Sequence, residues 1–145
     1  MLEPGWLDFS HYYMSAHHRA LTNSKAAKGT EIWITETAAA WASGTAGVCD
    51  GFVSGFWYND QLGMAATTGY SAMCRQCLVG GNYSLIDQLN GFKPNPDYWT
   101  AFLWRNLMGT KFLAIDQVMP EMGDYLAEIR AYMTCTPHGA PGCAS

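Results

Sequence analysis

The sequence predicts an α/β protein that forms part of a larger fold, and two observations carry this prediction. Helix-like and strand-like segments alternate over residues 1–109, whereas residues 110–145 contain strand-like segments only. Such alternation indicates parallel strands joined by helices, and the change of character indicates a second, all-β region. Because two parallel strands can neither cover their own faces nor close a barrel, we expect the chain to need further strands.

The composition is that of a globular protein without a surface for nucleic acid. Of the 145 residues, 49% are hydrophobic, 14% aromatic and 14% charged, and the net charge is −4. The apolar content excludes a disordered chain, and the acidic balance provides no basic patch for nucleic acid. No apolar run reaches the ~18 residues of a membrane helix, and no signal-peptide pattern follows Met1.

The first element is a helix predicted over residues 4–28. Pro4 suits a first helical position and Gly29 suits the position after the last turn, with apolar side chains at helical spacing between them. His11, His17 and His18 lie on this helix. No two of them are four residues apart, so we predict no metal site there.

The second element is a strand that ends on Glu36. Residues 32–35 are β-branched or aromatic and apolar on both faces, which is typical of a parallel strand covered on each side. Side chains alternate along a strand, so Glu36 is expected on the face of Ile34. Its carboxylate stands where α/β proteins keep their catalytic groups, the alternative being an acid that merely ends a strand in water.

A loop of small residues follows this strand at positions 38–44. Small side chains let backbone amides approach a ligand closely, and such amides are natural donors to an anionic group. Trp41 lies within the loop and offers a flat apolar face on which a sugar can stack. The loop therefore favours a catalytic or binding role for the strand end over the alternative of a solvated acid.

The remaining elements follow from the same signals. Asp50 is predicted to cap a helix that runs to Leu62 and stops at Gly63, and Asn95 is predicted to cap a helix that starts at Pro96. The other expected elements are a buried strand at 71–79, a glycine-rich turn at 80–84, the end of the last helix at 108 and strands at 111–115 and 129–136.

The cysteines offer an alternative function. Cys74 and Cys77, together with Cys135, His138 and Cys143, supply the ligand types of a zinc site. Residues three apart on a strand point to opposite faces, which favours two packed core thiols at the first pair. A non-catalytic zinc-binding or protein-interaction module therefore stands as the alternative.

Five sequence blocks occur in order along the chain: WITETAAAW at 33–41, GFWYNDQLGM at 55–64, CRQCLVGGNY at 74–83, NPDYW at 95–99 and LMGTK at 107–111. Together they resemble the heparanase and heparanase-like glycoside hydrolases of family 79, and the similarity extends from residue 2 to residue 135. Several blocks in one order are far more specific than any single block.

The resemblance implies a (β/α)8 TIM barrel with a small β-sandwich packed on it. Residues 1–109 would hold the helix after strand six, strand seven with Glu36, strand eight and the last helix, and residues 110–145 would begin the sandwich. The N-terminal half of the barrel, which function would require, would lie outside this chain. A secreted, extracellular, lysosomal or membrane-associated protein is implied by the same resemblance.

The resemblance also implies a retaining β-glucuronidase that needs no cofactor or metal, with Glu36 as the nucleophile. The family's acid/base is a Glu in an Asn-Glu pair on strand four, which this chain lacks, so we expect the chain alone to be inactive. A carbohydrate-binding relative without activity is a further possibility. Cys135 would pair with a cysteine beyond this chain. The positions implied to bind a glucuronic-acid-containing glycan or glycoside are Trp41, Ala42, Ser43, Gly44, Gln76, Gly81 and Tyr83.

Overall fold

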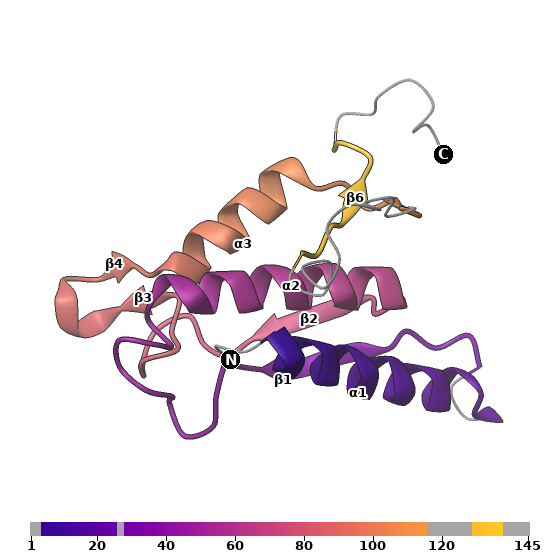
Figure 1. Ribbon diagram of the computed structural model, residues 1–145, viewed down its shortest axis with the longest axis horizontal. Coiled ribbons are helices and arrows are strands. Elements are labelled where there is room, and N and C mark those ends of the chain that lie inside the picture. The colour runs from indigo at the N-terminus through magenta and orange to yellow at the C-terminus, as the bar shows by residue number, and fades with distance from the viewer. Residues whose placement is uncertain (1–3, 26–27, 116–128, 138–145) are drawn as a thin grey trace.

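The computed structural model describes residues 4–25, 28–115 and 129–137 (Figure 1). Helices and short sheets alternate along this part of the chain, as the sequence predicts for an α/β fragment. No helix among these residues is long and apolar enough to cross a bilayer. The elements are α1 (Pro4–Thr22), β1 (Trp33–Thr37), α2 (Phe52–Thr68), β2 (Ala72–Arg75), β3 (Ile86–Asp87), the 3-10 helix η2 (Gln88–Asn90), β4 (Lys93–Pro94), α3 (Pro96–Leu107), β5 (Phe112–Leu113) and β6 (Met133–Thr134).

The central sheet is a parallel pair of strands joined by a helix. β1 and β2 run parallel with Ile34 opposite Met73, and α2 forms the crossover between them. This confirms the expected β-α-β order. The register shifts between Ile34 and Thr37, which means that β1 carries one extra residue there. An extra residue re-aims the side chains beside it, so counting along the strand does not place Glu36 on the face of Ile34.

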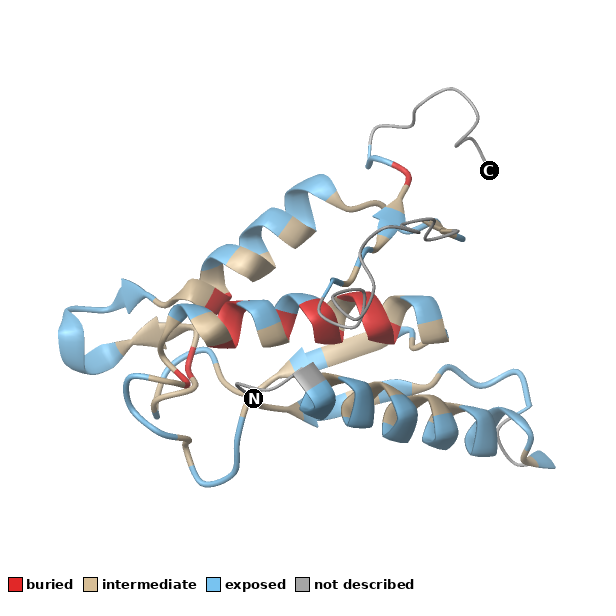
Figure 2. Ribbon diagram, in the orientation of Figure 1, coloured by how far each residue is buried: buried red, intermediate tan, exposed pale blue. Residues whose placement is uncertain are grey.

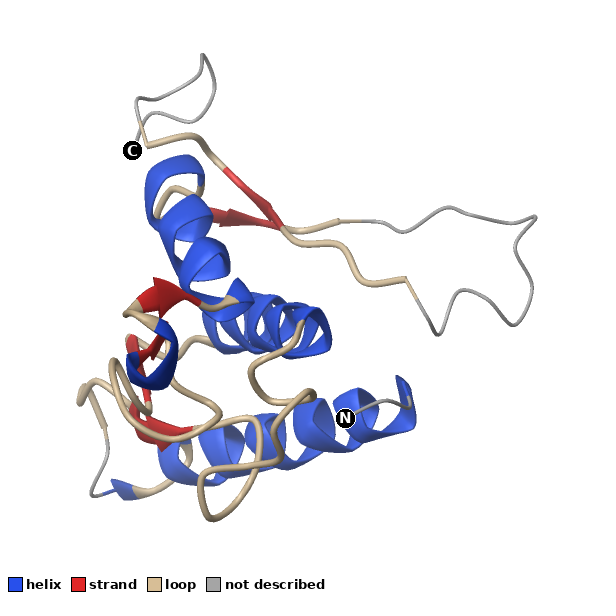
Figure 3. Ribbon diagram, turned by 90° about the vertical axis from the view of Figure 1, so that its left-hand side faces the viewer, coloured by secondary structure: helices blue, strands red, loops and turns tan. Residues whose placement is uncertain are grey.

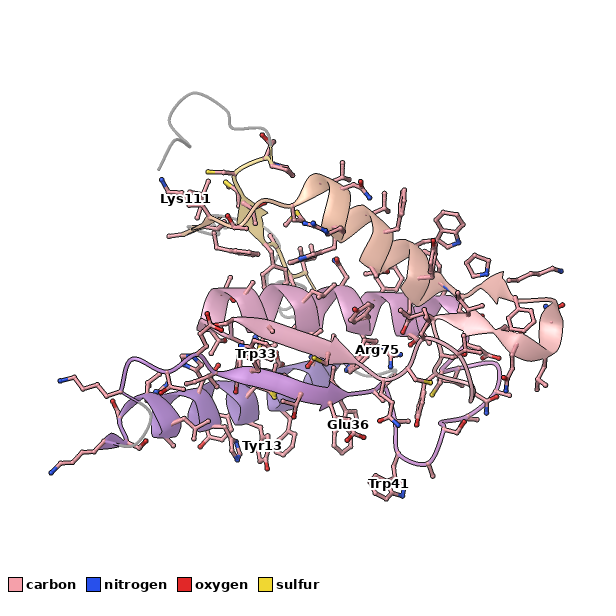
Figure 4. The ribbon with its side chains drawn as sticks, turned by 180° about the vertical axis from the view of Figure 1, so that it is seen from behind. Tyr13, Trp33, Glu36, Trp41, Arg75 and Lys111 are labelled. Carbon is pink, nitrogen blue, oxygen red and sulfur yellow. The ribbon has the colours of Figure 1, made fainter. Side chains whose placement is uncertain are left out.

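The helices cover one face of this sheet. In Figure 1 α1 and α2 lie in front of the strands, and in Figure 4 the strands lie in front of these helices. Figure 3 shows α1, α2 and α3 one above another. On the opposite face Trp33 is 54% exposed and Cys74 is also exposed. The expectations of a strand covered on each side and of a packed Cys74 thiol are therefore wrong for the described residues, because no described helix covers that face.

The core of the chain follows α2 (Figure 2). This helix carries eight buried residues, among them Met64 and Ala65, and it packs on α1 on one side and on α3 on the other. Many large apolar side chains elsewhere stay exposed, including Trp6, Phe9 and Phe52. Many of the aromatic side chains therefore lie on the surface of the described chain and not in its core.

Both ends of α2 differ from the prediction. Gly51 occupies the N-cap position and Asp50 does not cap the helix. At the other end the helix continues through Gly63 and ends at Thr68, and Gly69 caps it with a left-handed φ of 105°. Gly63 has a packing role instead, because a Cβ there would lie 2.3 Å from the ring of Tyr132. Close approach of the ring, rather than helix termination, explains the glycine.

The other elements agree in type and differ in length. α3 begins after Asn95 as predicted, but the Asn95 side chain donates to the carbonyl of Ser84 instead of capping the helix. β5 and β6 pair antiparallel and are only two residues long each. The small hairpin β3–β4, with η2 at its tip, was not expected, and Asp87 accepts hydrogen bonds from two backbone amides of η2.

A polar cluster fastens the segment before β6 to the helices. The Tyr132 hydroxyl donates to Asp60 Oδ1 at 2.7 Å and lies 3.0 Å from His11 Nε2, while Arg130 pairs with Asp8 and Asp60. Asp60 is almost fully buried. Burial and the Asp60 carboxylate raise the pKa of Tyr132 well above its ordinary value. The phenol is therefore held protonated in the folded chain.

Replacing Tyr132 by Phe is expected to lower the free energy of unfolding by about 1–2 kcal/mol at pH 7, because a buried carboxylate loses a hydrogen-bond donor. The raised pKa also gives a pH dependence. The unfolded tyrosine ionises near pH 10 while the folded one does not, so this residue's contribution is present below pH 10 and is lost as the pH rises further. Urea unfolding at pH 7 and above pH 10 should show a smaller alkaline loss for Y132F. The exposed Tyr12→Phe variant serves as the control.

Candidate functional site

One pocket lies where the two parallel strands end, and Glu36 lines it. Its volume is roughly 770 Å³. Five of the eight site residues predicted from the sequence lie around it, although they come from the ends of two different strands. The lining residues are Glu36, Thr37, Ala38, Ala40, Trp41, Ala42, Gln76 and Tyr83.

The geometry at Glu36 is that of an available carboxylate. Figure 4 shows Glu36 near the end of the β1 arrow, Trp41 on the loop that follows and Arg75 at the end of the neighbouring strand. Glu36 is exposed, and within residues 4–25, 28–115 and 129–137 its carboxylate has no hydrogen-bond or ion-pair partner. It is also the only acid that lines the pocket among the described residues. The carboxylate is therefore free to act on a ligand.

The loop beside Glu36 adopts an unusual backbone conformation. Ala42, Ser43 and Gly44 have φ values of 50°, 73° and 75°, all in the left-handed region. Residues with a Cβ rarely adopt this region, and such positions concentrate at functional sites. The amides of Ala42 and Ser43 donate to no acceptor in the described part of the chain. The loop thus supplies two free backbone donors at the rim of a pocket that contains a carboxylate.

Three of the predicted binding residues, Ser43, Gly44 and Gly81, do not line the pocket. Ser43 and Gly44 follow Ala42 directly, and Gly81 lies against Ser43 where the loop after β1 meets the loop after β2. Ser43 Oγ accepts a hydrogen bond from the amide of Asn82, and the Gly44 carbonyl accepts one from the Asn82 side chain. Residues that come from two separate sequence blocks are therefore brought into direct contact.

A buried ion pair is bonded to the backbone of both segments that line the pocket. The Arg75 guanidinium lies 2.6 Å from Asp97 Oδ2, and both side chains are at most 3% exposed. Arg75 also donates to the backbone carbonyls of Thr37, Gln76 and Tyr83. Because Thr37 ends β1 while Gln76 and Tyr83 lie on the loop after β2, one side chain ties together both strand ends that carry the site.

Asp97 is the counter-charge of this network and reaches it from the first turn of α3. Its Oδ2 also accepts a hydrogen bond from Ser54 on α2. Burial raises the pKa of Asp97, and the hydrogen bonds and charge of Arg75, with the Ser54 hydroxyl, lower it only in part. No role for Arg75 or Asp97 was predicted from the sequence. Nothing local in the sequence marks the two residues as partners, because they lie 22 positions apart.

A second pocket of roughly 540 Å³ lies between α2, α3 and residues 130–132. Most of its lining side chains are apolar, such as Phe56, Leu103 and Trp104, and no carboxylate or histidine lines it among the described residues. It therefore offers no described carboxylate or imidazole for acid–base chemistry, and the hydroxyl of its tyrosine, Tyr132, is already bonded to Asp60.

The described cysteines do not form the alternative zinc site. Cys74 is exposed at β2, and the Cys77 thiol donates to the carbonyl of Gly80. Cys135 is disulfide-bonded, which corrects the expectation that its partner lies beyond this chain and removes the thiolate that zinc would need. His138 and Cys143 lie outside the described residues. No group of three metal-binding side chains occurs in the described ranges, so a zinc module is not supported.

Comparison with known proteins gives consistent matches. Residues 1–63 match the profile of the N-terminal domain of glycosyl hydrolase family 79. The chain is 43% identical over 115 residues to heparanase-like protein 3 of Arabidopsis thaliana, which covers 78% of the chain and 20% of that protein. Baicalin-beta-D-glucuronidase of Scutellaria baicalensis is 45% identical (59% of the chain, 16% of the protein), and heparanase of Gallus gallus is 38% identical (74% and 20%).

A carboxylate at the end of a parallel strand, beside free backbone amides and aromatic side chains, is a site suited to carbohydrate chemistry. The chain belongs to glycosyl hydrolase family 79, among its heparanase-like members. It spans about a fifth of the length of the curated relatives that it matches. The predicted family is confirmed.

Proposed function

We propose that this chain supplies the nucleophile and part of the sugar subsite of a retaining glycoside hydrolase that cleaves β-linked glucuronic acid from glycans or glycoconjugates. The observation that carries the proposal is the free Glu36 carboxylate in a pocket with Trp41, Gln76 and Tyr83. Two relatives are named as a heparanase and a beta-D-glucuronidase, which supports the same chemistry and sugar.

In the proposed reaction Glu36 attacks the anomeric carbon. The bond from this carbon to the aglycone oxygen breaks while a bond to a Glu36 oxygen forms, and a second carboxyl group gives its proton to the leaving oxygen. Water, deprotonated by that second group, then releases the sugar from the glycosyl ester. Retention requires the two carboxyl groups to lie about 5–5.5 Å apart. No other described acid lines the pocket, so on this proposal the second group lies outside the described residues, in the intact enzyme.

The pocket offers contacts for an acidic sugar. The unpaired amides of Ala42 and Ser43 are donors suited to a carboxylate, and Ala42 lines the pocket. Trp41 is 93% exposed and can stack on the apolar face of a sugar ring. Gln76 adds an amide side chain and Tyr83 a hydroxyl for sugar hydroxyl groups.

The architecture that accompanies this function is a TIM barrel. On this proposal residues 1–109 form the closing part of the barrel, and residues 110–145 begin a β-sandwich. The parallel β1–α2–β2 unit and the antiparallel β5–β6 pair support this division. A barrel would also cover Trp33 and the open face of the sheet. We further infer an extracellular or lysosomal protein, by its similarity to heparanases.

The sharpest test uses a hybrid enzyme in which this chain replaces the matching segment of the Scutellaria beta-glucuronidase. We expect the hybrid to hydrolyse an aryl β-glucuronide with retention of configuration. A 2-fluoro glucuronyl fluoride should label it covalently on the peptide that contains Glu36, as read by mass spectrometry. Labelling of another residue, or an inverted first product, would overturn the proposal. A folded hybrid that binds glucuronate without hydrolysis would favour a carbohydrate-binding protein instead.

The 145-residue chain by itself is expected to show no turnover. Its pocket holds a nucleophile, but no second carboxyl group to protonate the leaving oxygen lines it among the described residues. Hydrolysis of an aryl β-glucuronide is measured with the purified chain and compared with the hybrid at equal concentration. Turnover by the chain alone that is lost in its Glu36→Gln variant would contradict the expectation and would show that a second acid is present.

A further inference from the structure

The contact between the two site loops involves one side chain that the proposed reaction does not use. Asn82 lies on the loop after β2 and makes two hydrogen bonds to the loop after β1. Its backbone amide donates to Ser43 Oγ at 3.0 Å, and its side-chain Nδ2 donates to the Gly44 carbonyl at 3.0 Å. The bonded residues are 39 and 38 positions apart in the sequence, so this contact is purely tertiary.

The contact falls on the strained part of the loop. Ala42 and Ser43 carry a Cβ and yet have φ values of 50° and 73°. Such a conformation persists only when surrounding contacts hold it. Within the turn the amide of Gly44 donates to the Trp41 carbonyl. Among the described residues, Asn82 is the group outside the loop that makes hydrogen bonds to Ser43 and Gly44.

Gly81, the residue before Asn82, leaves space for the contact between the two loops. Gly81 has a φ of 78°, and a Cβ added there would lie 2.2 Å from Ser43 Oγ. Any larger residue at position 81 would therefore displace the Ser43 hydroxyl. The Ser43 hydroxyl therefore occupies the space that a side chain at position 81 would fill, and Asn82 follows directly after this glycine.

We propose that Asn82 is a positioning residue, which holds residues 42–44 in their left-handed turn through Ser43 Oγ and the Gly44 carbonyl. The role of the turn rests on the proposed function. Held in this way, the turn keeps the free amides of Ala42 and Ser43 at the pocket rim, ready for the carboxylate of an acidic sugar. Asn82 therefore sets affinity for that sugar, whereas Glu36 performs the chemistry.

The test compares two variants of the hybrid enzyme. Asn82→Ala removes the bond to the Gly44 carbonyl, and Ser43→Ala removes the acceptor of the Asn82 amide. For each we expect KM on an aryl β-glucuronide to rise by about three- to tenfold, the effect of one hydrogen bond, while kcat changes less than threefold. Because both bonds hold one turn, the double variant should raise KM by less than the product of the single effects.

The matched control is Asn90→Ala, in the exposed η2 turn at the tip of the β3–β4 hairpin, which should leave KM unchanged. Thermal unfolding of each hybrid shows whether it is folded, and Asn82→Asp, which loses the same donor with less change of shape, replaces a variant that does not fold. KM within twofold of the parent in folded N82A and S43A, or an equal fall in kcat, overturns the proposal.

Failure of this inference and failure of the proposed function give different results. If Glu36→Gln inactivates the hybrid while the Asn82 and Ser43 variants keep the parent KM, the nucleophile stands and the positioning role is wrong. If Glu36→Gln keeps full activity, the proposed function itself is wrong.

Discussion

Glu36→Gln in the hybrid enzyme is expected to lower kcat on an aryl β-glucuronide by at least about 10³-fold. An amide cannot form the glycosyl ester, and removal of a nucleophile that acts within a catalytic unit has effects of this order or larger. The side chains are nearly equal in size, and Glu36 is exposed without a partner in the described part of the chain, so the fold should be unaffected. Steady-state kinetics and thermal unfolding of the same preparations measure the two effects separately.

Two further measurements separate a nucleophile from an acid that only shapes the pocket. In Glu36→Gly, added azide should restore release of the aglycone, because azide can attack the anomeric carbon from the space that the carboxylate leaves. The product would be an α-glucuronyl azide, of inverted configuration. The matched control is Glu31→Gln, an exposed acid just before β1 whose carboxylate accepts a hydrogen bond from the Trp33 side chain. More than a tenth of the parent kcat in folded E36Q would rule out a covalent role.

The sequence predicted which helices and strands form more accurately than the residues at which they begin and end. Local signals located α1, β1, α2, β2 and α3, because periodicity and capping residues act within a few positions. The end of α2 was wrong since Gly63 serves a contact with Tyr132, which is 69 residues away in the sequence. Glycine chosen for tertiary contact and glycine chosen to end a helix look the same in a sequence. The β3–β4 hairpin was missed because each of its strands has only two residues.

The residues of the site also divide into those that local sequence signals predict and those that depend on tertiary contacts. Glu36 follows from strand chemistry, and Trp41, Gln76 and Tyr83 follow from their sequence blocks; the structure gathers all four around one pocket. Their supports could not be predicted in this way. The Asn82 contact and the Arg75–Asp97 pair join residues that are distant in sequence, and nothing local distinguishes them from surface polar groups.

The Arg75–Asp97 pair shows how strongly the site depends on such a support. Replacing Arg75 by Met is expected to lower the free energy of unfolding by about 3–5 kcal/mol at pH 7, because it leaves a buried carboxylate without its counter-charge. It would also release the carbonyls of Thr37, at the end of β1, and of Tyr83, on the loop after β2. Urea unfolding followed by tryptophan fluorescence measures the loss. The control is Arg105→Met on the exposed side of α3, which should change stability by less than about 0.5 kcal/mol.

The pH dependence of this loss identifies its cause. Burial already raises the pKa of Asp97, and removing Arg75, which lowers it, raises it further. A folded-state pKa above the unfolded value means that stability is greatest below about pH 4, where Asp97 is protonated in both states, and falls as the pH rises through the folded value. The destabilisation by R75M should therefore be small near pH 4 and grow toward pH 7. A loss of equal size at both pH values would assign the role of Arg75 to packing against Trp57 and Tyr58, over whose rings its guanidinium lies, instead of to its charge.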